Sequence, residues 1–419
     1  MLSRRQFLVR SAAGLAILPG ASALIAACSS SSTKSSPTTK HSVAGSSTAP
    51  PAGPEGLIGT PGNAVKLPIY DDNKAIADGL KPEAGPLTIL NYADYVSPDV
   101  VKAFETKYGV KVEITPFDAD SDLVEKVRTG ALTGDLILSA SYDTYYKMVA
   151  AKLVQPLNHS YLPNFVNVLP ALQDPFYDSG SKYTVPYTLY ALGLDYRTDE
   201  IDPATVAAKG WELLWDPKYK GKISVLNNDR ESIAAALLRK GIVDLNTTDA
   251  TVIAQAGSDL KELVASNVKV TIDTYKNVPT DVTTIGEGYS GDMINAIGQL
   301  PQGTDAKVLG FWKPEIGKLA VNNDFQTVLK AAKNPVLAHL FINFIIDNEN
   351  AFSNFAFTGY QPALAATSAD ELIKRQLVPE TLRSCLLSNE EVAKGLRIHA
   401  LPLDKAKLYE TAYSTFNAG

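Results

Sequence analysis

The stretch GEGYSGD, residues 286–292, is the part of the sequence whose residue types and spacing most directly suggest chemistry. Its glycines match G-x-G-x-x-G, the pattern with which a strand–turn–helix unit holds the pyrophosphate of a dinucleotide. That fingerprint belongs at the first strand–helix turn of a domain and needs an acidic residue about 20 positions further on. This stretch lies late in the chain, and Asp305 and Glu315, which are 14 and 24 positions after the last glycine, Gly291, both miss that spacing. The bulky Tyr289 would also crowd a pyrophosphate, so a dinucleotide site is disfavoured.

A second interpretation assigns these glycines to a turn that positions the Tyr289 ring, with Asp292 beginning the next helix. Other catalytic patterns are missing from the sequence: it has no G-x-x-x-x-G-K-[ST], G-x-S-x-G, H-E-x-x-H, C-x-x-C or EF-hand match. No two of its histidines have the i, i+4 spacing of metal ligands, and they are His41, His159, His339 and His399. We therefore expect no metal, no cofactor and no enzymatic activity.

The elements that must position such residues alternate between strands and helices. Strands are predicted at residues 87–92, 110–117 and 135–140, and helices at 98–108, 120–131 and 142–153. This alternation predicts right-handed βαβ units around a parallel sheet. A strand is also predicted at 282–285 and a helix at 292–300. The long extended run at 183–197 is not followed by a helix pattern, so we expect it to cross from one domain to another.

The N-terminal residues indicate export. Residues 3–8, SRRQFL, are typical of a twin-arginine signal, and residues 12–27 are apolar and small. The sequence IAAC at 25–28 resembles a lipobox. Residues 1–27 are therefore predicted to be a twin-arginine lipoprotein signal peptide and Cys28 to be lipidated; a plain signal peptide with an incidental cysteine is the alternative. Residues 28–85 are predicted to begin with this lipidated cysteine and to form a disordered tether rich in Ser, Thr and Pro.

Charge and cysteine content restrict the partners. The formal net charge is −6, and removing a signal peptide that carries Arg4, Arg5, Arg10 and no acid makes it −9. An acidic chain disfavours nucleic acid as a partner and mildly suits a cationic ligand. Cys28 and Cys385 are the two cysteines, so lipidation of Cys28 leaves Cys385 without a disulfide partner. Cys385 is predicted to be a small buried residue.

Several motifs, taken in order along the chain, resemble the spermidine/putrescine-binding proteins of ABC importers. They are NYADY at 91–95, DLIL at 135–138, YTVPY at 183–187, LWDPKYKG at 214–221, DRE at 229–231, GYSGD at 288–292 and TGY at 358–360. The resemblance implies an α/β chain with the type II periplasmic-binding-protein fold, in which two α/β lobes meet at a hinge and an interlobe cleft. It places lobe 1 at residues 86–190 with 323–369 and lobe 2 at 191–322 with 370–419.

The same resemblance implies a ligand pocket in which tyrosine rings pack the methylenes of an amine and carboxylates bind its ammonium groups. Each candidate also has a structural interpretation: the acids as helix-start or turn residues, the tyrosines as ordinary core aromatics. The matched positions are Tyr92, Asp94, Tyr95, Tyr142, Glu231, Tyr289, Asp324 and Tyr360.

The implied function is the capture of a polyamine such as putrescine or spermidine by a lipid-anchored monomer. The protein would sit on the outer face of the cytoplasmic membrane and deliver the ligand to a membrane permease. Asn228 and Asn322 stand where many family members have an Asp and a Trp, so the pocket is expected to be roomier and another amine remains possible. A sugar, a peptide or an anionic solute is an alternative ligand, for which a cleft lined by Arg230 or Lys313 would be a sign. An exported cofactor-dependent enzyme and a scaffold without a ligand are further alternatives.

Overall fold

The computed structural model describes residues 54–117 and 123–417, all of which belong to one compact unit. The predictions for residues 1–27, for Cys28 and for the tether as far as residue 53 lie outside the described residues.

The strands of the described residues form one mixed sheet in the order β2-β1-β3-β9-β4-β7-β5-β6, with β10 and β8 also paired to β4. The pairs β1–β2, β1–β3, β5–β6 and β5–β7 are parallel, as the alternation of strands and helices predicts. The strands are β1 Leu87–Asn91, β2 Val112–Pro116, β3 Leu136–Ala140, β4 Val185–Arg197, β5 Ile223–Val225, β6 Lys269–Val270, β7 Ile285–Tyr289, β8 Leu309–Trp312, β9 Val321–Val328 and β10 Gln361–Pro362.

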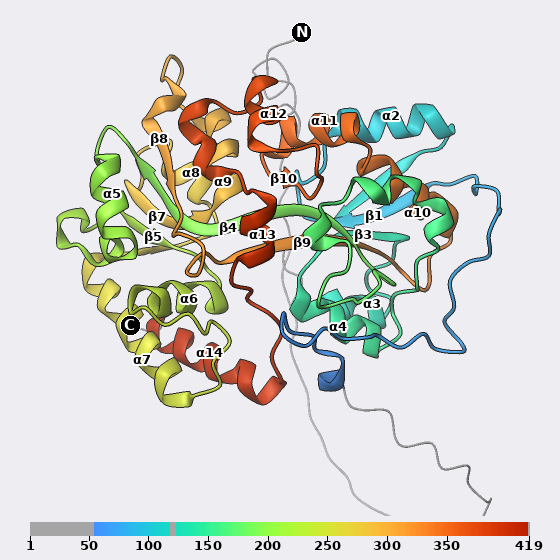
Figure 1. Cartoon of the computed structure of the whole chain (residues 1–419), viewed down its shortest axis with the longest axis horizontal. Helices are drawn as coiled ribbons and strands as arrows, with labels where there is room; N and C mark the ends of the chain where they lie inside the picture. Colours follow the sequence, from blue (N-terminus) through green and yellow to red (C-terminus); the bar gives the residue numbers. More distant parts are fainter. Residues whose placement is uncertain (1–53, 118–122, 418–419) are drawn as a thin grey trace, which may run out of the picture. The chain divides into compact units, whose positions relative to one another are not determined.

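Strand β4 joins the two halves of this sheet. Residues 185–191 of β4 pair with β9 and residues 188–189 with β10, whereas residues 192–197 pair with β7 and β8. The crossing predicted for the extended run at 183–197 is therefore confirmed. Figure 1 shows β4 and β9 side by side between two groups of elements. Below, β1, β2, β3, β9, β10 and the first part of β4 are called the first sheet half, and β5–β8 with the remainder of β4 the second.

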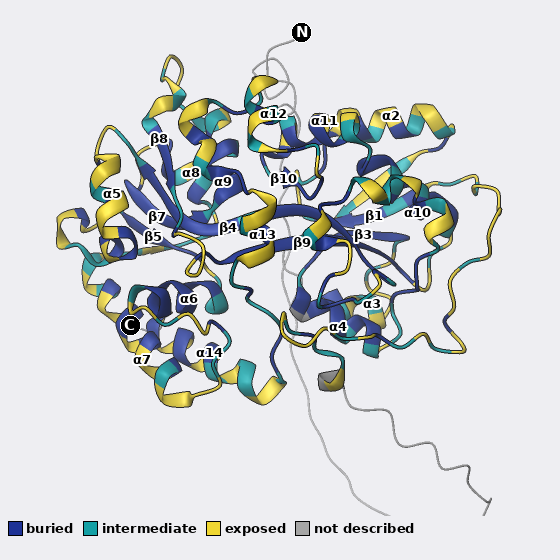
Figure 2. Cartoon of the chain, in the orientation of Figure 1, coloured by how far each residue is buried: buried dark blue, intermediate teal, exposed yellow. Residues whose placement is uncertain are grey.

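Helices cover the faces of both sheet halves, with short 3-10 helices between them. Figure 2 shows that their outer faces are exposed while the central strands are buried. The helices are α2 Pro98–Tyr108, α3 Leu123–Arg128, α4 Tyr142–Ala150, α5 Pro203–Lys209, α6 Asp229–Arg239, α7 Ala250–Glu262, α8 Thr274–Asn277, α9 Ser290–Ala296, α10 Pro335–Ile345, α11 Asn348–Thr358, α12 Ala369–Lys374, α13 Asn389–Lys394 and α14 Leu403–Asn417.

Local sequence explains the ends of these helices. Helix α2 begins with Pro98 after an extended Ser97 and ends at Gly109, whose φ of 68° suits glycine better than any residue with a side chain. Val100 and Phe104, one turn apart, are buried on the face that packs inward. Within the described ranges, no helix is both long enough and apolar enough to cross a membrane.

Buried apolar side chains form three clusters. One lies among α6, α7 and α14 against the second sheet half, and another lies between α4 and the first sheet half. The third runs from Leu87 and Phe104 to Met293 and Phe311, and so it contains residues from both halves. Burial of such continuous apolar area favours the packed arrangement of the two halves at roughly 25 cal/mol per Å² removed from water.

The predicted tether is wrong for residues 54–85, which pack against the first sheet half. Leu67 is 1% exposed, and the backbone carbonyl of Pro68 accepts a 2.6 Å hydrogen bond from the Tyr183 hydroxyl. At the far end of the segment, the Glu83 carboxylate accepts hydrogen bonds of 3.0 Å from the Val336 and Leu337 amides in the first turn of α10. The segment is ordered because its few apolar and acidic side chains find specific partners on the folded domain.

Candidate functional site

Gly286 and Gly288 of GEGYSGD lie inside a strand and Gly291 lies in a helix, so the predicted turn at these residues is wrong. Strand β7 runs from Ile285 to Tyr289 and pairs with β4 and β5, and α9 begins at Ser290. The glycines provide space: a Cβ added at Gly286 would lie 2.2 Å from the Ser224 hydroxyl, and one added at Gly288 would lie 1.9 Å from an Asp195 oxygen. Close packing against neighbouring strands therefore requires glycine here.

The first acid of the site is Asp324, in β9. One of its oxygens accepts hydrogen bonds from the Tyr95 hydroxyl at 2.7 Å and from the Thr188 hydroxyl at 3.2 Å. The Tyr95 and Thr188 hydroxyls are themselves 2.8 Å apart. Tyr95 comes from the turn after β1 and Thr188 from β4, so three separate segments of the first sheet half converge on this carboxylate.

The second acid is Glu231, in the first turn of α6. It is 6% exposed and accepts a hydrogen bond from the Tyr289 hydroxyl at the end of β7. The side chain of Asn228 caps α6 by accepting from the Arg230 and Glu231 amides at 3.1 and 3.2 Å. Asn228 stands where many members of the family that this sequence resembles have an Asp. As a cap, it fixes the start of the helix that carries Glu231.

The third acid, Asp292, connects the two sheet halves. It lies in the first turn of α9, and the Tyr360 hydroxyl from the first half donates a 2.7 Å hydrogen bond to it. The Tyr360 ring is 5.2 Å from that of Tyr95, in an edge-to-face arrangement. It covers Gly291, where an added Cβ would lie 2.6 Å from the ring. Sequence reasoning assigned Asp292 only to the start of a helix and so missed this contact.

Tyr190 is a central residue that sequence reasoning missed. Its ring contacts that of Tyr289 edge to face, with centroids 5.2 Å apart. Burial raises the pKa of its hydroxyl well above the usual value, and the nearby charges of Asp324 and Glu231 raise it further. Because side chains alternate along a strand, Tyr190 shares a face of β4 with Thr188, a signal already present in the sequence.

We call these side chains the acid–tyrosine cluster. Hydrogen bonds and ring contacts join its members into two groups, Asp324–Tyr95–Tyr360–Asp292 and Glu231–Tyr289–Tyr190. Between the groups, the charge of Asp324 raises the pKa of the Glu231 carboxyl. The cluster consists of Tyr95, Tyr190, Glu231, Tyr289, Asp292, Asp324 and Tyr360.

The remaining predicted residues lie around the cluster or apart from it. Tyr92 contacts the Tyr95 ring at 6.2 Å but packs more closely on Phe117, at 4.6 Å. Tyr142 is mostly buried and donates a 2.6 Å hydrogen bond to the side chain of Asn323, which precedes Asp324. Asp94 is exposed in a turn with φ of 55°. It therefore lies at the surface while the other predicted acids are gathered inside.

The electrostatics of the cluster suit a cationic guest. Burial raises the pKa of the Glu231 carboxyl to about 7, with the Asp324 charge adding to the shift and the Tyr289 hydrogen bond opposing it. Burial also raises the pKa of Asp292 to about 7, against the effect of the hydrogen bond from Tyr360. An amine cation among these carboxylates would favour their ionised forms and would offset the cost of burying them.

Two cations that would indicate an anionic ligand are engaged elsewhere. The Arg230 guanidinium donates to the Asn246 side chain at 2.7 Å and to the His399 carbonyl at 3.2 Å. Lys313 forms a 2.8 Å ion pair with Glu391. These contacts lie outside the acid–tyrosine cluster, while the Arg230 charge opposes the rise that burial causes in the pKa of the neighbouring Glu231 carboxyl.

Unpartnered acceptors lie at the same place. In the part of the chain that the structure describes, the buried Asn322 Oδ1 and Asp292 Oδ2 atoms have no hydrogen-bond partner. Asn322 pairs with Tyr190 across β9 and β4. A buried acceptor without a donor costs about 1–3 kcal/mol, and a ligand ammonium group can supply that donor.

Other chemistry finds no support among the described residues. They contain no group of three or more His, Cys, Asp or Glu side chains arranged to hold a metal ion. Cys385 is 1% exposed, which confirms the prediction that it is buried. Burial raises the pKa of its thiol well above the usual value, so the reactive thiolate is disfavoured.

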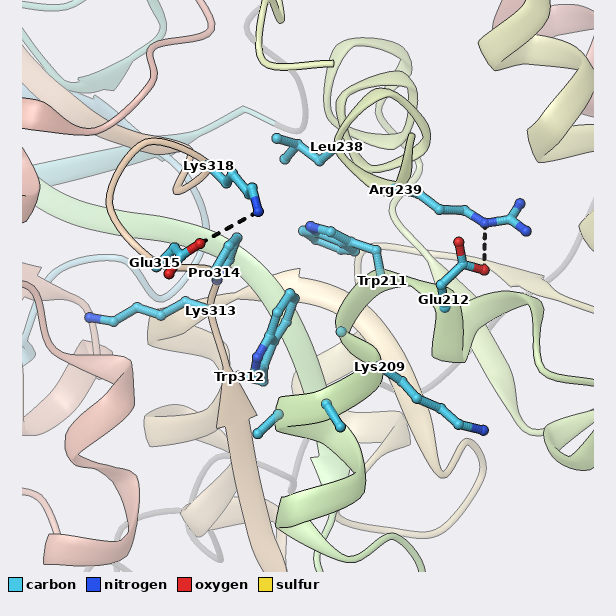
Figure 3. Close-up of a pocket in the computed structure, with 13 residues that line it drawn as sticks. Lys209, Trp211, Glu212, Leu238, Arg239, Trp312, Lys313, Pro314, Glu315 and Lys318 are labelled. Atoms are coloured by element: carbon cyan, nitrogen blue, oxygen red, sulfur yellow. Dashed lines mark hydrogen bonds and ion pairs between the residues drawn. The ribbon is translucent and has the colours of Figure 1, made fainter. Parts of the chain in front are cut away.

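Two surface hollows lie away from the cluster. One of about 470 Å³ is lined by residues of α2 and the segments beside it. The other, of about 420 Å³, is shown in Figure 3, where the rings of Trp211 and Trp312 lie edge to face at the centre. Their centroids are 5.7 Å apart. None of the sequence-predicted site residues lines either hollow.

Comparisons with known proteins agree with this architecture. The family model described as "Bacterial extracellular solute-binding protein" matches residues 99–379, which is more than half of the chain. A spermidine/putrescine-binding periplasmic protein of Salmonella typhimurium is 28% identical over 342 residues, covering 80% of this chain and 92% of that protein. A putrescine/cadaverine-binding protein of Pseudomonas aeruginosa is 27% identical over 289 residues, covering 64% and 76%.

A solved structure is similar throughout the folded part. A putative spermidine/putrescine ABC transporter protein from Listeria monocytogenes superposes with a TM-score of 0.66 at 26% identity, covering 79% of this chain and 98% of that one. The expected α/β fold with two lobes is therefore confirmed. The chain belongs to the bacterial extracellular solute-binding protein family.

Proposed function

We propose that this chain is the solute-binding component of an ABC importer and that its ligand is a polyamine-like cation. The observation that carries the proposal is the acid–tyrosine cluster, in which Glu231, Asp292 and Asp324 each accept a hydrogen bond from a tyrosine hydroxyl. Two relatives named for spermidine, putrescine or cadaverine binding support the same class of ligand.

Recognition would use the two chemical parts of such a ligand. Ammonium groups would bind the carboxylates, with charge-assisted hydrogen bonds of about 2.7–2.9 Å. The methylenes would pack on the faces of Tyr95, Tyr190, Tyr289 and Tyr360, and each cation–π contact contributes roughly 0.5–2 kcal/mol. Binding is reversible, and the protein performs no chemistry on the ligand.

Release and capture would follow from relative motion of the two lobes. We assign residues 86–190 and 323–369 to lobe 1 and residues 191–322 and 370–419 to lobe 2, with β4 and β9 as the hinge strands. The Tyr360–Asp292 hydrogen bond then joins the lobes in the closed form. Opening would break this contact and expose the carboxylates to a solute, as in other hinged binding proteins.

The same proposal places the protein outside the cytoplasm. Residues 1–27 would direct export by the twin-arginine pathway, and lipid on Cys28 would anchor a monomer to the outer face of the cytoplasmic membrane. Residues 28–53 would then be the tether between the lipid and the folded domain. This length of chain lets the domain reach a permease in the same membrane.

Substituting Asp324 tests the proposed function. Asp324→Asn keeps the shape but removes the charged partner of a desolvated ammonium group, so we expect putrescine or spermidine to bind more than about tenfold more weakly. Calorimetric titration of the full chain measures the change. Asp99→Asn is the matched control, because Asp99 is exposed in the first turn of α2, away from the cluster. Equal amine affinity in Asp324→Asn and wild type would contradict the proposal.

A further inference from the structure

A buried arginine lies where the hinge strands meet the C-terminal part of the chain. The Leu396 amide donates to the Leu319 carbonyl at 2.7 Å, and the Val321 amide donates to the Leu396 carbonyl at 2.9 Å. The next residue, Arg397, is 8% exposed. Its guanidinium donates to the Val321 carbonyl at 2.9 Å and to the Val392 carbonyl at 2.6 Å. These bonds fix the cation beside the first residue of β9.

This guanidinium faces the first sheet half through Tyr142. Burial raises the pKa of the Tyr142 hydroxyl, and the adjacent Arg397 guanidinium opposes that rise, whereas the Asp324 charge adds to it. Tyr142 hydrogen-bonds to Asn323, the neighbour of Asp324 in β9. Tyr142 also influences Tyr190 at the centre of the acid–tyrosine cluster. In β9, Arg397 holds the Val321 carbonyl, three residues before Asp324, and Tyr142 binds Asn323 between them, so Arg397 lies on the Tyr142 side of the acids.

The charge of Arg397 has no counter-charge in the described part of the chain. No carboxylate of the described residues lies within 4.0 Å of its nitrogens. Other arginines with little exposure differ: Arg197 pairs with Asp199 at 2.7 Å, and Arg239 pairs with Glu212 at 3.0 Å. Arginine stays charged in proteins, and a buried charge without a counter-charge is costly. The carbonyl partners of Arg397 carry no net charge, so the positive charge of its guanidinium is not neutralised at this side of the site.

We propose that Arg397 is a specificity-determining residue that excludes a ligand ammonium group from the Tyr142 side of the site and accepts a carboxylate there. The ligand would then carry its ammonium groups at the Glu231 and Asp324 side and a neutral or anionic group at its other end. Short amines and ω-amino acids fit this description better than a linear triamine does. The inference rests on the proposed function, because it concerns the far end of the same amine ligand.

The physical basis is the difference between two charges at one position. An ammonium group beside a fixed guanidinium is repelled in a medium where screening by water is weak. A carboxylate at that position can accept charge-assisted hydrogen bonds from the guanidinium N–H groups that the Val321 and Val392 carbonyls leave unused. Lysine at position 397 would keep the positive charge, whereas glutamine would keep hydrogen-bond donors without charge. The two variants Arg397→Lys and Arg397→Gln therefore separate charge from packing.

The experiment compares ligands that differ only at one end. The full-length wild type, Arg397→Gln and Arg397→Lys are titrated calorimetrically with putrescine and 4-aminobutanoate, and with 1,6-diaminohexane and 6-aminohexanoate. Two chain lengths are used so that the second end group of the ligand can reach Arg397. The diamine and amino acid of the length that wild type binds more tightly are then compared. Within that pair, we expect Arg397→Gln to shift the affinity ratio at least about tenfold toward the diamine. Arg397→Lys should stay within about threefold of wild type.

Each ratio is taken on one variant, so a loss of folded protein affects both ligands equally. A ratio in Arg397→Gln within threefold of wild type would overturn the inference, and so would an equal shift in Arg397→Lys. These results would leave amine binding itself intact. Failure of wild type to bind any amine would instead contradict the proposed function and the inference together.

Discussion

Tyrosine hydroxyls replace cations as the partners of the acids in the acid–tyrosine cluster. Tyr95, Tyr289 and Tyr360 donate to Asp324, Glu231 and Asp292, respectively. A hydroxyl satisfies a carboxylate oxygen but brings no positive charge, so burial shifts these acids toward their protonated forms. The pKa values of Asp292 and Glu231 are raised to about 7, so a bound cation would change the ionisation of these two carboxyls most strongly.

Amine binding is therefore expected to depend on pH. Between about pH 4.5 and pH 7 the folded protein holds protons on these carboxyls that the unfolded chain has lost, so ligand-free stability falls as pH rises through this window. A cation requires the ionised carboxylates, so putrescine should bind about tenfold more weakly at about pH 6 than at about pH 8 and should release protons at the lower pH. Titration calorimetry in two buffers with different ionisation enthalpies measures both quantities.

The control for this prediction is Glu231→Gln, which cannot ionise at that position. It should bind putrescine more weakly and lose much of the pH dependence. Equal wild-type affinity at the two pH values, with no proton release, would show that these carboxyls are already ionised in the ligand-free protein.

Among the strands, the close approach of β4 and β7 positions Tyr289, which binds Glu231 in the second sheet half. Gly288 pairs with Gly193 and the Asp195 carboxylate packs against it, and Tyr289 at the next position reaches Glu231. Asp195 is fully buried, and neither of its oxygens has a hydrogen-bond partner among the described residues. Any side chain at Gly288 would have to displace this carboxylate or separate the strands.

We expect Gly288→Ala to destabilise the protein. The added Cβ would lie 1.9 Å from an Asp195 oxygen, and overpacking of this kind costs about 1–3 kcal/mol. Chemical denaturation, followed by fluorescence, measures the free energy of unfolding. Gly298→Ala is the matched control, because nothing lies within 4 Å of a Cβ added there, and its effect should stay within about 0.5 kcal/mol. Equal stability of the two variants would contradict the packing argument.

The sequence predicted elements well where local signals were strong. Ser97, Pro98 and Gly109 mark both ends of α2, and the extended run at 183–197 correctly indicated a strand shared between two sheet halves. The sequence predicts a strand at 282–285, but β7 runs from Ile285 to Tyr289. The prediction stops too early because the two glycines of β7 are typical of a turn, although sheet pairing keeps them extended. Local propensity could not show that neighbouring strands, rather than a ligand, require glycine at these positions.

The site was only partly predictable for a related reason. Asp324, Glu231, Tyr95, Tyr289 and Tyr360 came from the family resemblance, and the structure gathers them. Tyr190 could have been found from the alternation along β4, but Asp292 and Arg397 depend on contacts between segments far apart in the sequence. Such contacts leave no local pattern, because they are set by how the two sheet halves meet.

For the chain as a whole, the two sheet halves and the strands crossing between them bring the acid–tyrosine cluster together. The hinge strands β4 and β9 carry Thr188, Tyr190 and Asp324, while α6 and α9 bring Glu231 and Asp292 from the second half. Residues 54–85 brace the first half and reach α10 through Glu83. A ligand held by acids from both halves would stabilise their closed arrangement, with a free energy that rises with the logarithm of its concentration divided by its Kd.

A crystal structure of the full chain with putrescine tests the proposed amine site most directly. We expect an ammonium nitrogen within about 3 Å of a carboxylate oxygen of Asp324 or Glu231, with the methylenes packed on tyrosine rings of the acid–tyrosine cluster. Putrescine bound elsewhere, for example between Trp211 and Trp312, with the cluster unchanged, would contradict it.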